Sequence, residues 1–271
     1  MNPESRSSAE AALGAGLGID RTVGIDLASQ PSKTAACAIE WDGANAVASF
    51  ASDTSDAGLL EYMAGAAKVG IDCPFGWPTG FVEAITAHAR QEPWPTGEQS
   101  HSEELRSLRF RETDRRIAAE VDGRWPLSVS TDLIGIVAIR YARLESDLAA
   151  AGKDVSRDGS GLVAETYPAA ALRYWGMTSR GYKGPRSVEL LPTMVEQLRS
   201  RMPWLRLRDA AAESLCRTSH DAFDALICAL IARAVQRGES THPTTTSDRA
   251  SASVEGWILV PTGQPGALLV G

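Results

Sequence analysis

The sequence predicts an α/β fold with a mixed five-stranded sheet, three antiparallel strands followed by parallel ones, flanking helices and a helical insertion. Two observations carry this prediction. Short runs rich in Ala, Val, Ile and aromatic residues come first, and the turn sequence Asp42–Asn45 lies between two of them. A run with helical spacing, Ser55–Ala67, then precedes a strand at Lys68–Asp72 that repeats the pattern of the first one. A helix between them implies a crossover, so the fourth strand should lie parallel to the first.

The other elements are predicted from the same patterns. Strands are expected at Thr22–Ala28, Thr34–Trp41, Ala46–Ala51, Lys68–Asp72 and Leu162–Thr166, with Gly256–Val260 as a candidate for a further edge strand. Helices are expected at Ser55–Ala67, Phe81–Gln91, Ser102–Val121, Ser130–Ala151, Pro168–Gly176 and Ser187–Met202, followed by a last one that begins at Thr218 or Ser219. The polar stretch Ser240–Ser253 predicts a linker.

This order of elements predicts one domain. Residues 1–20 are expected to be a disordered leader. A signal peptide is not favoured, because Glu4, Arg6 and Glu10 do not make a basic start and the Ala/Gly/Leu stretch after them is only weakly apolar. Residues 21–261 are expected to form a single domain with a helical insertion at about 74–161, and residues 262–271 a tail.

Composition narrows the classes of function. The net charge of −7 and the pI of about 5.2 argue against a protein that coats DNA, although a nuclease with local basic patches stays open. The four cysteines form no C-x-x-C pair, which argues against a zinc site and favours buried thiols in a reducing cytoplasm. No apolar run approaches the ~20 residues of a membrane span, so no membrane partner is expected. The oligomeric state stays open, with a homodimer as one possibility.

The last predicted helix carries two acids three residues apart. Apolar residues from Phe223 to Ala234 recur at the spacing of one buried face, and Asp221 and Asp224 project from another side. Their like charges repel unless a cation lies between them, which a divalent ion with oxygen ligands would supply. A structural reading competes for Asp221, because an acid in the first turn of a helix is favoured by the helix dipole.

Three more acids fall at the ends of predicted strands: Asp26, Asp72 and Glu165. The carboxyl edge of parallel strands is where α/β proteins form their sites, although each acid alone is more often a turn or capping residue. Together with Asp221 and Asp224 they predict a carboxylate cluster that Mg²⁺ or Mn²⁺ would neutralise. We therefore expect Asp26, Asp72, Asp221 and Asp224 as metal ligands, and these four with Glu165 as the catalytic set for phosphodiester cleavage.

Several motifs resemble known families. Val23–Asp26 looks like the first-strand motif of the RNase H-like fold, and His220–Leu226 is similar to the last-helix motif of the RuvC-type Holliday-junction resolvases. The motifs at Gly70–Gly76, Arg111–Asp114, Glu165–Pro168, Asp221–Leu226 and Glu255–Ile258 together resemble the bacterial and archaeal family known as domain of unknown function 429. That resemblance spans about Val23 to Pro261 and implies an RNase H-like fold and a predicted nuclease activity on DNA or RNA.

Basic residues give a second line of reasoning about substrate. Arginines cluster in the insertion, and further Arg and Lys residues are interleaved with aromatic residues between Arg173 and Arg208. Candidate substrate-binding residues are Arg111, Arg115, Lys183 and Arg186. The competing interpretation is a solvated helix face with ion pairs such as Glu112–Arg116.

Two other functions fit parts of the pattern. An ATP-dependent phosphotransferase of the sugar-kinase and actin type also begins with a Gly-Ile-Asp strand and a hairpin. That class needs a Gly-rich phosphate loop, and Ala28–Pro31 is a poor one. A non-catalytic nucleic-acid-binding protein that kept the fold is the second alternative.

Overall fold

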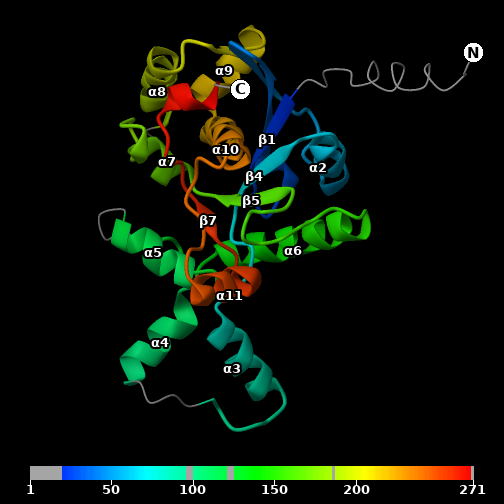
Figure 1. Ribbon diagram of the computed structural model, residues 1–271, viewed down its shortest axis with the longest axis vertical. Coiled ribbons are helices and arrows are strands. Elements are labelled where there is room, and N and C mark those ends of the chain that lie inside the picture. The colour runs from blue at the N-terminus through cyan, green and yellow to red at the C-terminus, as the bar shows by residue number, and fades with distance from the viewer. Residues whose placement is uncertain (1–19, 96–99, 121–124, 185–186, 270–271) are drawn as a thin grey trace, which may run out of the picture.

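A seven-stranded mixed sheet organises the chain (Figure 1). The computed structural model describes residues 20–95, 100–120, 125–184 and 187–269. The strands are β1 (Asp20–Asp26), β2 (Ala35–Asp42), β3 (Asn45–Phe50), β4 (Lys68–Asp72), β5 (Val163–Thr166), β6 (Leu205–Leu207) and β7 (Ile258–Leu259). Their order across the sheet is β6-β3-β2-β1-β4-β5-β7.

The strand directions agree with the predicted meander and crossover. Strands β1, β2 and β3 are antiparallel neighbours, and Asp42 pairs with Asn45 across the expected hairpin turn. Strand β4 lies parallel to β1, and β5 lies parallel to β4. The predicted number of five strands was wrong, because β6 and β7 extend the sheet at its two edges. Strand β7 lies within the candidate edge strand Gly256–Val260, whereas β6 was not predicted, because its three residues are too few for an alternating pattern to identify.

Helices cover both faces of the sheet. The α-helices are α2 (Asp56–Met63), α3 (Thr79–Ala89), α4 (His101–Arg109), α5 (Glu112–Glu120), α6 (Ile134–Ala150), α7 (Pro168–Tyr174), α8 (Ser187–Arg201), α9 (Ala210–Thr218), α10 (His220–Gln236) and α11 (Thr246–Glu255). Two 3-10 turns, η2 (Pro31–Lys33) and η3 (Pro265–Leu268), complete the described elements. Among the described residues, no helix combines the length and apolar character needed to cross a membrane.

Two predicted segments differ from the structure. The helix expected at Ser102–Val121 is broken at Phe110, whose extended backbone separates α4 from α5, and Val121 lies outside the described residues. The break lets the Arg111 side chain enter the core, where it is 1% exposed. The linker expected at Ser240–Ser253 contains helix α11, which begins with a capping box formed by Thr245 and Asp248.

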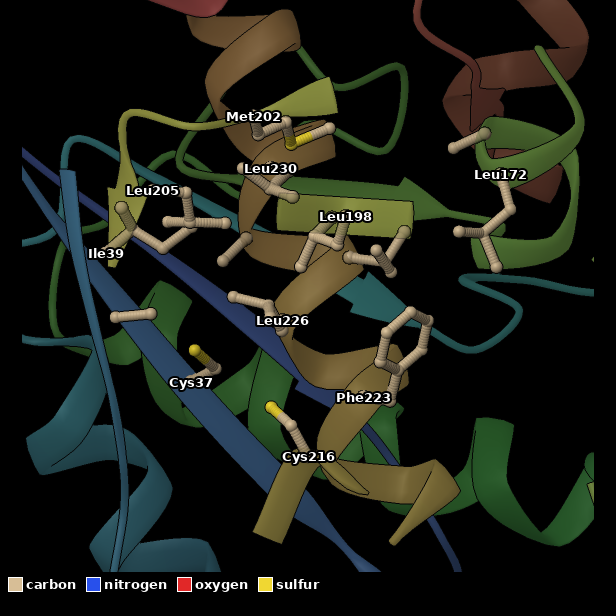
Figure 2. Close-up of a cluster of buried hydrophobic side chains, with 14 of the residues drawn as sticks. Cys37, Ile39, Leu172, Leu198, Met202, Leu205, Cys216, Phe223, Leu226 and Leu230 are labelled. Atoms are coloured by element: carbon tan, nitrogen blue, oxygen red, sulfur yellow. The ribbon is translucent and has the colours of Figure 1, made fainter. Parts of the chain in front are cut away.

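The core has two layers, one on each face of the sheet. On one face, α10 packs with α7, α8 and α9, and Figure 2 shows Phe223, Leu226 and Leu230 of α10 among these side chains. On the other face, α2 and α6 cover β1 and β4. The sequence predicted a single buried face for α10, but every residue from Ala222 to Ala234 is buried, because helices lie behind it as well as strands in front.

Two glycines bring α10 unusually close to the sheet. Gly24 of β1 and Gly70 of β4 are paired in register, and both lie beneath α10. A Cβ atom added to Gly24 would lie 2.1 Å from Ala225 O and Ala229 N, and one on Gly70 would lie 2.5 Å from Cys228 O. The helix backbone therefore occupies the space that side chains at these two positions would need.

The chain outside the central layers follows the predicted organisation only in part. Helices α3 and α4 of the insertion extend away from the sheet in Figure 1, whereas α6 packs on the core. The predicted leader lies outside the described residues except for Asp20, which begins β1. The predicted tail includes η3, whose Leu268 is buried and accepts a hydrogen bond from the Arg233 side chain at 3.0 Å. All four cysteines are free and buried, as expected.

Candidate metal centre

Asp26 and Asp72 stand side by side at the carboxyl ends of two parallel strands. They are partners in the β1–β4 register, and both side chains are half-buried. Each follows its glycine by two residues, so the sequence Gly-Ile-Asp occurs at the same level in both strands. The two strands thus place two carboxylates at the edge where β-strands of α/β proteins present their functional groups.

Helix α10, which packs on one face of the sheet, adds a third carboxylate. Its first turn is capped by Ser219, whose hydroxyl accepts a hydrogen bond from the Ala222 N–H at 3.2 Å. One turn later, Asp224 is completely buried. Ligand atoms of Asp26, Asp72 and Asp224 all lie within 4.8 Å of one another, so the predicted convergence of these three acids is confirmed.

Asp221 belongs to a second group that shares Asp26. Ligand atoms of Asp26, His220 and Asp221 also lie within 4.8 Å of one another. His220 was not predicted as a ligand, although it directly precedes the first acid of the motif. Its Nδ1 lies 2.7 Å from Asp221 Oδ1, and the N-cap of the helix is Ser219 rather than Asp221.

Lys183 and Tyr182 reach the cluster from the loop after α7. The Lys183 ammonium lies 2.5 Å from Asp224 Oδ2, and the Tyr182 hydroxyl donates to Asp224 Oδ1 at 2.8 Å. Lys183 was predicted to contact substrate, and its side chain is 53% exposed while its ammonium faces the acids. It therefore brings one positive charge to three carboxylates.

The closely spaced carboxylates of the cluster favour the binding of protons or cations. Burial and repulsion from Asp72 and Asp224 raise the pKa of Asp26 well above its usual value. Burial raises the pKa of Asp72 to about 7, although Lys183 opposes the shift. Burial also raises the pKa of Asp224, with Lys183 again opposing. For Lys183, burial lowers the pKa, but attraction to Asp224, Asp72 and Asp26 outweighs it and the net shift is upward.

Glu165 lies in the same region but has another partner. Both of its carboxylate oxygens accept hydrogen bonds from Arg111, at 2.7 and 2.8 Å, and Oε2 also accepts from the Phe75 N–H at 3.1 Å. Neither of the two candidate metal groups found among the described residues includes it. The structure therefore brings together four of the five predicted acids and pairs the fifth with an arginine.

The Arg111 guanidinium has no donor left for substrate. Its five N–H groups are directed at Asp114 Oδ1 and Oδ2, Glu165 Oε1 and Oε2 and the Glu255 carbonyl, at 2.7–3.2 Å. Arg115 is half-buried and donates to the Glu112 carboxylate and the Phe110 carbonyl. Arg186, the fourth predicted substrate contact, lies outside the described residues.

A pocket of about 460 Å³ opens beside the acids. Asp26, Asp72, Lys183 and Tyr182 belong to its lining. The insertion contributes Leu127 and other apolar side chains to the same lining, so part of it packs beside the site. Asp26 and Asp72 thus face a cavity large enough for a small ligand.

The family of the chain follows from comparison with known proteins. Residues 18–248 match the family described as "Protein of unknown function (DUF429)". The chain belongs to this family. The match confirms the resemblance that the motifs predicted, and the DUF429 region contains Asp26, Asp72, Asp221 and Asp224. Comparisons with curated proteins and with solved structures give no match.

Proposed function

We propose that this DUF429 protein is a divalent-metal-dependent nuclease that hydrolyses phosphodiester bonds of nucleic acid. The observation that carries the proposal is the convergence of Asp26, Asp72 and Asp224, which come from three elements far apart in sequence. Three carboxylates with raised pKa values in a partly buried site leave a negative charge that Lys183 offsets only in part.

The donor atoms fit Mg²⁺ or Mn²⁺. Carboxylate oxygens are the ligands that these hard cations prefer, and a divalent ion would balance the two charges that remain after Lys183. Two groups that share Asp26 support a pair of neighbouring ions, one held with Asp72 and Asp224 and the other with Asp221 and His220. When bound, such ions supply an activated water and stabilise charge on the leaving oxygen of a phosphodiester.

The remaining residues position the site and the substrate. Lys183 is placed to contact a phosphate oxygen at the mouth of the pocket, because its ammonium lies at the acids while its side chain is exposed. Tyr182 fixes the orientation of Asp224 through its hydrogen bond. Glu165, whose oxygens are used by Arg111, supports the wall of the site and is not needed as a ligand.

The sheet supports the same proposal. The order β3-β2-β1-β4-β5, with β1–β3 antiparallel and β4 and β5 parallel to β1, is the arrangement expected of an RNase H-like fold. The phosphotransferase alternative has less support, because the segment after β1 contains Pro31 and the 3-10 turn η2 in place of a glycine-rich phosphate loop.

The test is a cleavage assay with matched variants. Purified protein is incubated with labelled single-stranded DNA, duplex DNA and RNA in Mn²⁺, Mg²⁺ or EDTA, and ATP hydrolysis is followed in parallel. We expect cleavage that needs the cation and falls by about 100-fold or more in Asp224→Asn. The control is Asp147→Asn, which removes an exposed aspartate of α6 and should leave cleavage unchanged. Metal-dependent ATP hydrolysis without cleavage of any nucleic acid would favour the phosphotransferase instead.

A further inference from the structure

The pocket beside the carboxylates is lined by two chemically different sets of side chains. Asp26, Asp72 and Lys183 are charged. A second set is apolar, and no step of phosphodiester hydrolysis requires it. Its members are Pro126, Leu127, Ile134, Val137 and Ile258, together with Tyr167. A ligand that fills the whole pocket therefore combines a phosphate-like group with a flat or bulky apolar group.

The size of the pocket and the charge of its surroundings argue against a duplex at this position. The volume of about 460 Å³ falls within the ~300–1,000 Å³ of small-ligand pockets. A duplex is held mainly by unpaired basic side chains along its phosphates. In the insertion, Arg111, Arg115 and Arg116 are already bound to acidic side chains, and the whole chain carries a charge of −7.

We propose that the apolar side chains of the pocket hold the base of one unpaired nucleotide whose phosphodiester lies against the carboxylates, so that the substrate is single-stranded. This inference rests on the proposed nuclease function and names its substrate class. A base buried against Leu127 and Ile134 loses water from its faces, and the phosphate next to it reaches Lys183. A paired base would first have to be unpaired and unstacked, which costs free energy that an unpaired base does not need.

Two residues near the pocket lining fit a strand that continues outward. Trp125 directly precedes the lining residues Pro126 and Leu127, and it is 40% exposed although its ring packs against Phe110. The guanidinium of the exposed Arg106 lies 5.9 Å from the centre of that ring. An exposed aromatic ring beside an arginine is the combination on which single-stranded nucleic acids stack a base and place a phosphate.

The experiment compares two exposed leucines, one in the pocket lining and one outside it. Leu127 lines the pocket and is 61% exposed, whereas Leu133 is 90% exposed and lies outside the pocket lining. Leu127→Asp and Leu133→Asp add the same charge at exposed positions, and aspartate is favourable at the N-cap position that Leu133 holds in α6. Binding is measured by fluorescence anisotropy in Ca²⁺, with labelled oligothymidylate of about ten nucleotides, a blunt duplex of equal length and thymidine 5′-monophosphate as competitor.

We expect the single strand to bind about tenfold or more tightly than the duplex, and Leu127→Asp to weaken it by about tenfold while Leu133→Asp changes it less than about twofold. Competition by the mononucleotide shows that one nucleotide suffices; Trp125→Ala should then weaken only the oligonucleotide. Equal binding of duplex and single strand, or equal effects of the two leucine variants, would overturn the inference. Cleavage of duplex and single strand at equal rates would remove the base pocket but keep the nuclease. Binding that depends on Leu127 without any cleavage would keep the base pocket but contradict the nuclease function.

Discussion

Replacement of Gly24 by alanine tests how the carboxylates are brought together. The added Cβ atom would lie 2.1 Å from two backbone atoms of α10, Ala225 O and Ala229 N. Because backbone cannot rotate aside, the helix must move by about 1.3 Å to restore an ordinary contact near 3.4 Å. Asp224 lies next to Ala225 and would move with it, away from Asp26 and Asp72.

Gly24→Ala is expected to lower both the free energy of unfolding, through overpacking, and the affinity for cations, through displacement of Asp224. Inserting a methyl group into a packed core typically lowers stability by about 1–3 kcal/mol, and contact with two backbone atoms of α10 places Gly24→Ala at the upper end of that range. Gly70→Ala should cost less, because its closest contact is 2.5 Å. Urea unfolding in EDTA measures the free energy of unfolding of each variant. Calorimetric titration with Mn²⁺ measures the cation affinity, which should fall by about tenfold or more in Gly24→Ala.

Gly80→Ala provides the matched control. Its Cβ would meet only the Leu108 side chain, at an ordinary 3.5 Å, within helix α3. Gly80 is the second residue of α3, so alanine there should be neutral or stabilising by at most the ~0.5–1 kcal/mol of a helix interior, with Mn²⁺ affinity unchanged. If Gly24→Ala unfolds and binds Mn²⁺ like Gly80→Ala, close approach of α10 is not what assembles the site.

Three further predictions follow from the charges of the site. In EDTA at neutral pH, the melting temperature of Asp224→Asn should match or exceed that of the wild type, because burial raises the pKa of Asp224 and its charge opposes folding. The variant should also lose the stabilisation that Mn²⁺ gives the wild type. A variant that keeps this stabilisation would remove Asp224 from the site. Because the pKa of Asp72 is raised from 3.8 to about 7, its contribution to stability in EDTA is fully present below pH 3.8 and is lost as the pH rises through about 7. Over that pH range the melting temperature of the wild type should fall relative to that of Asp72→Asn. Melting temperatures of the two proteins that change in parallel with pH would contradict the shift. Arg111→Met should lower the unfolding free energy by about 3–5 kcal/mol, because it leaves Asp114 and Glu165 buried without their partner; a stable variant that only loses substrate binding would instead make Arg111 a substrate contact.

The part of the site that could be predicted from sequence depends on local patterns. Strand-end aspartates and a helix with two acids three residues apart are visible in the sequence, and the sheet places Asp26 beside Asp72 as parallel strands require. The pairing of Arg111 with Glu165 is not visible, because 54 residues separate them and either side chain alone suits a catalytic role. Lys183 was assigned to substrate for its charge, and only the folded loop shows that it also contacts Asp224.

In the fold, too, elements with a local sequence pattern were predicted and elements that depend on tertiary contacts were missed. The antiparallel meander and the crossover to β4 were predicted because each strand is long enough to show its pattern and the turn residues are specific. Helix α11 was missed because its residues are mostly small and polar, so that its stability depends on the capping box and on Ala252 packing beneath Trp257. The break at Phe110 was missed for a similar reason, since the burial of Arg111 is a tertiary effect.

A crystal soaked in Mn²⁺ tests the central claim most directly, because the anomalous scattering of the ion locates it independently of any activity. The account predicts a peak within about 2–2.5 Å of carboxylate oxygens from Asp26, Asp72 and Asp224, with the Lys183 ammonium displaced from Asp224. A second peak is expected beside Asp221 and His220. Manganese bound only elsewhere on the protein, with Lys183 still paired to Asp224 at saturating Mn²⁺, would contradict a metal centre at these acids.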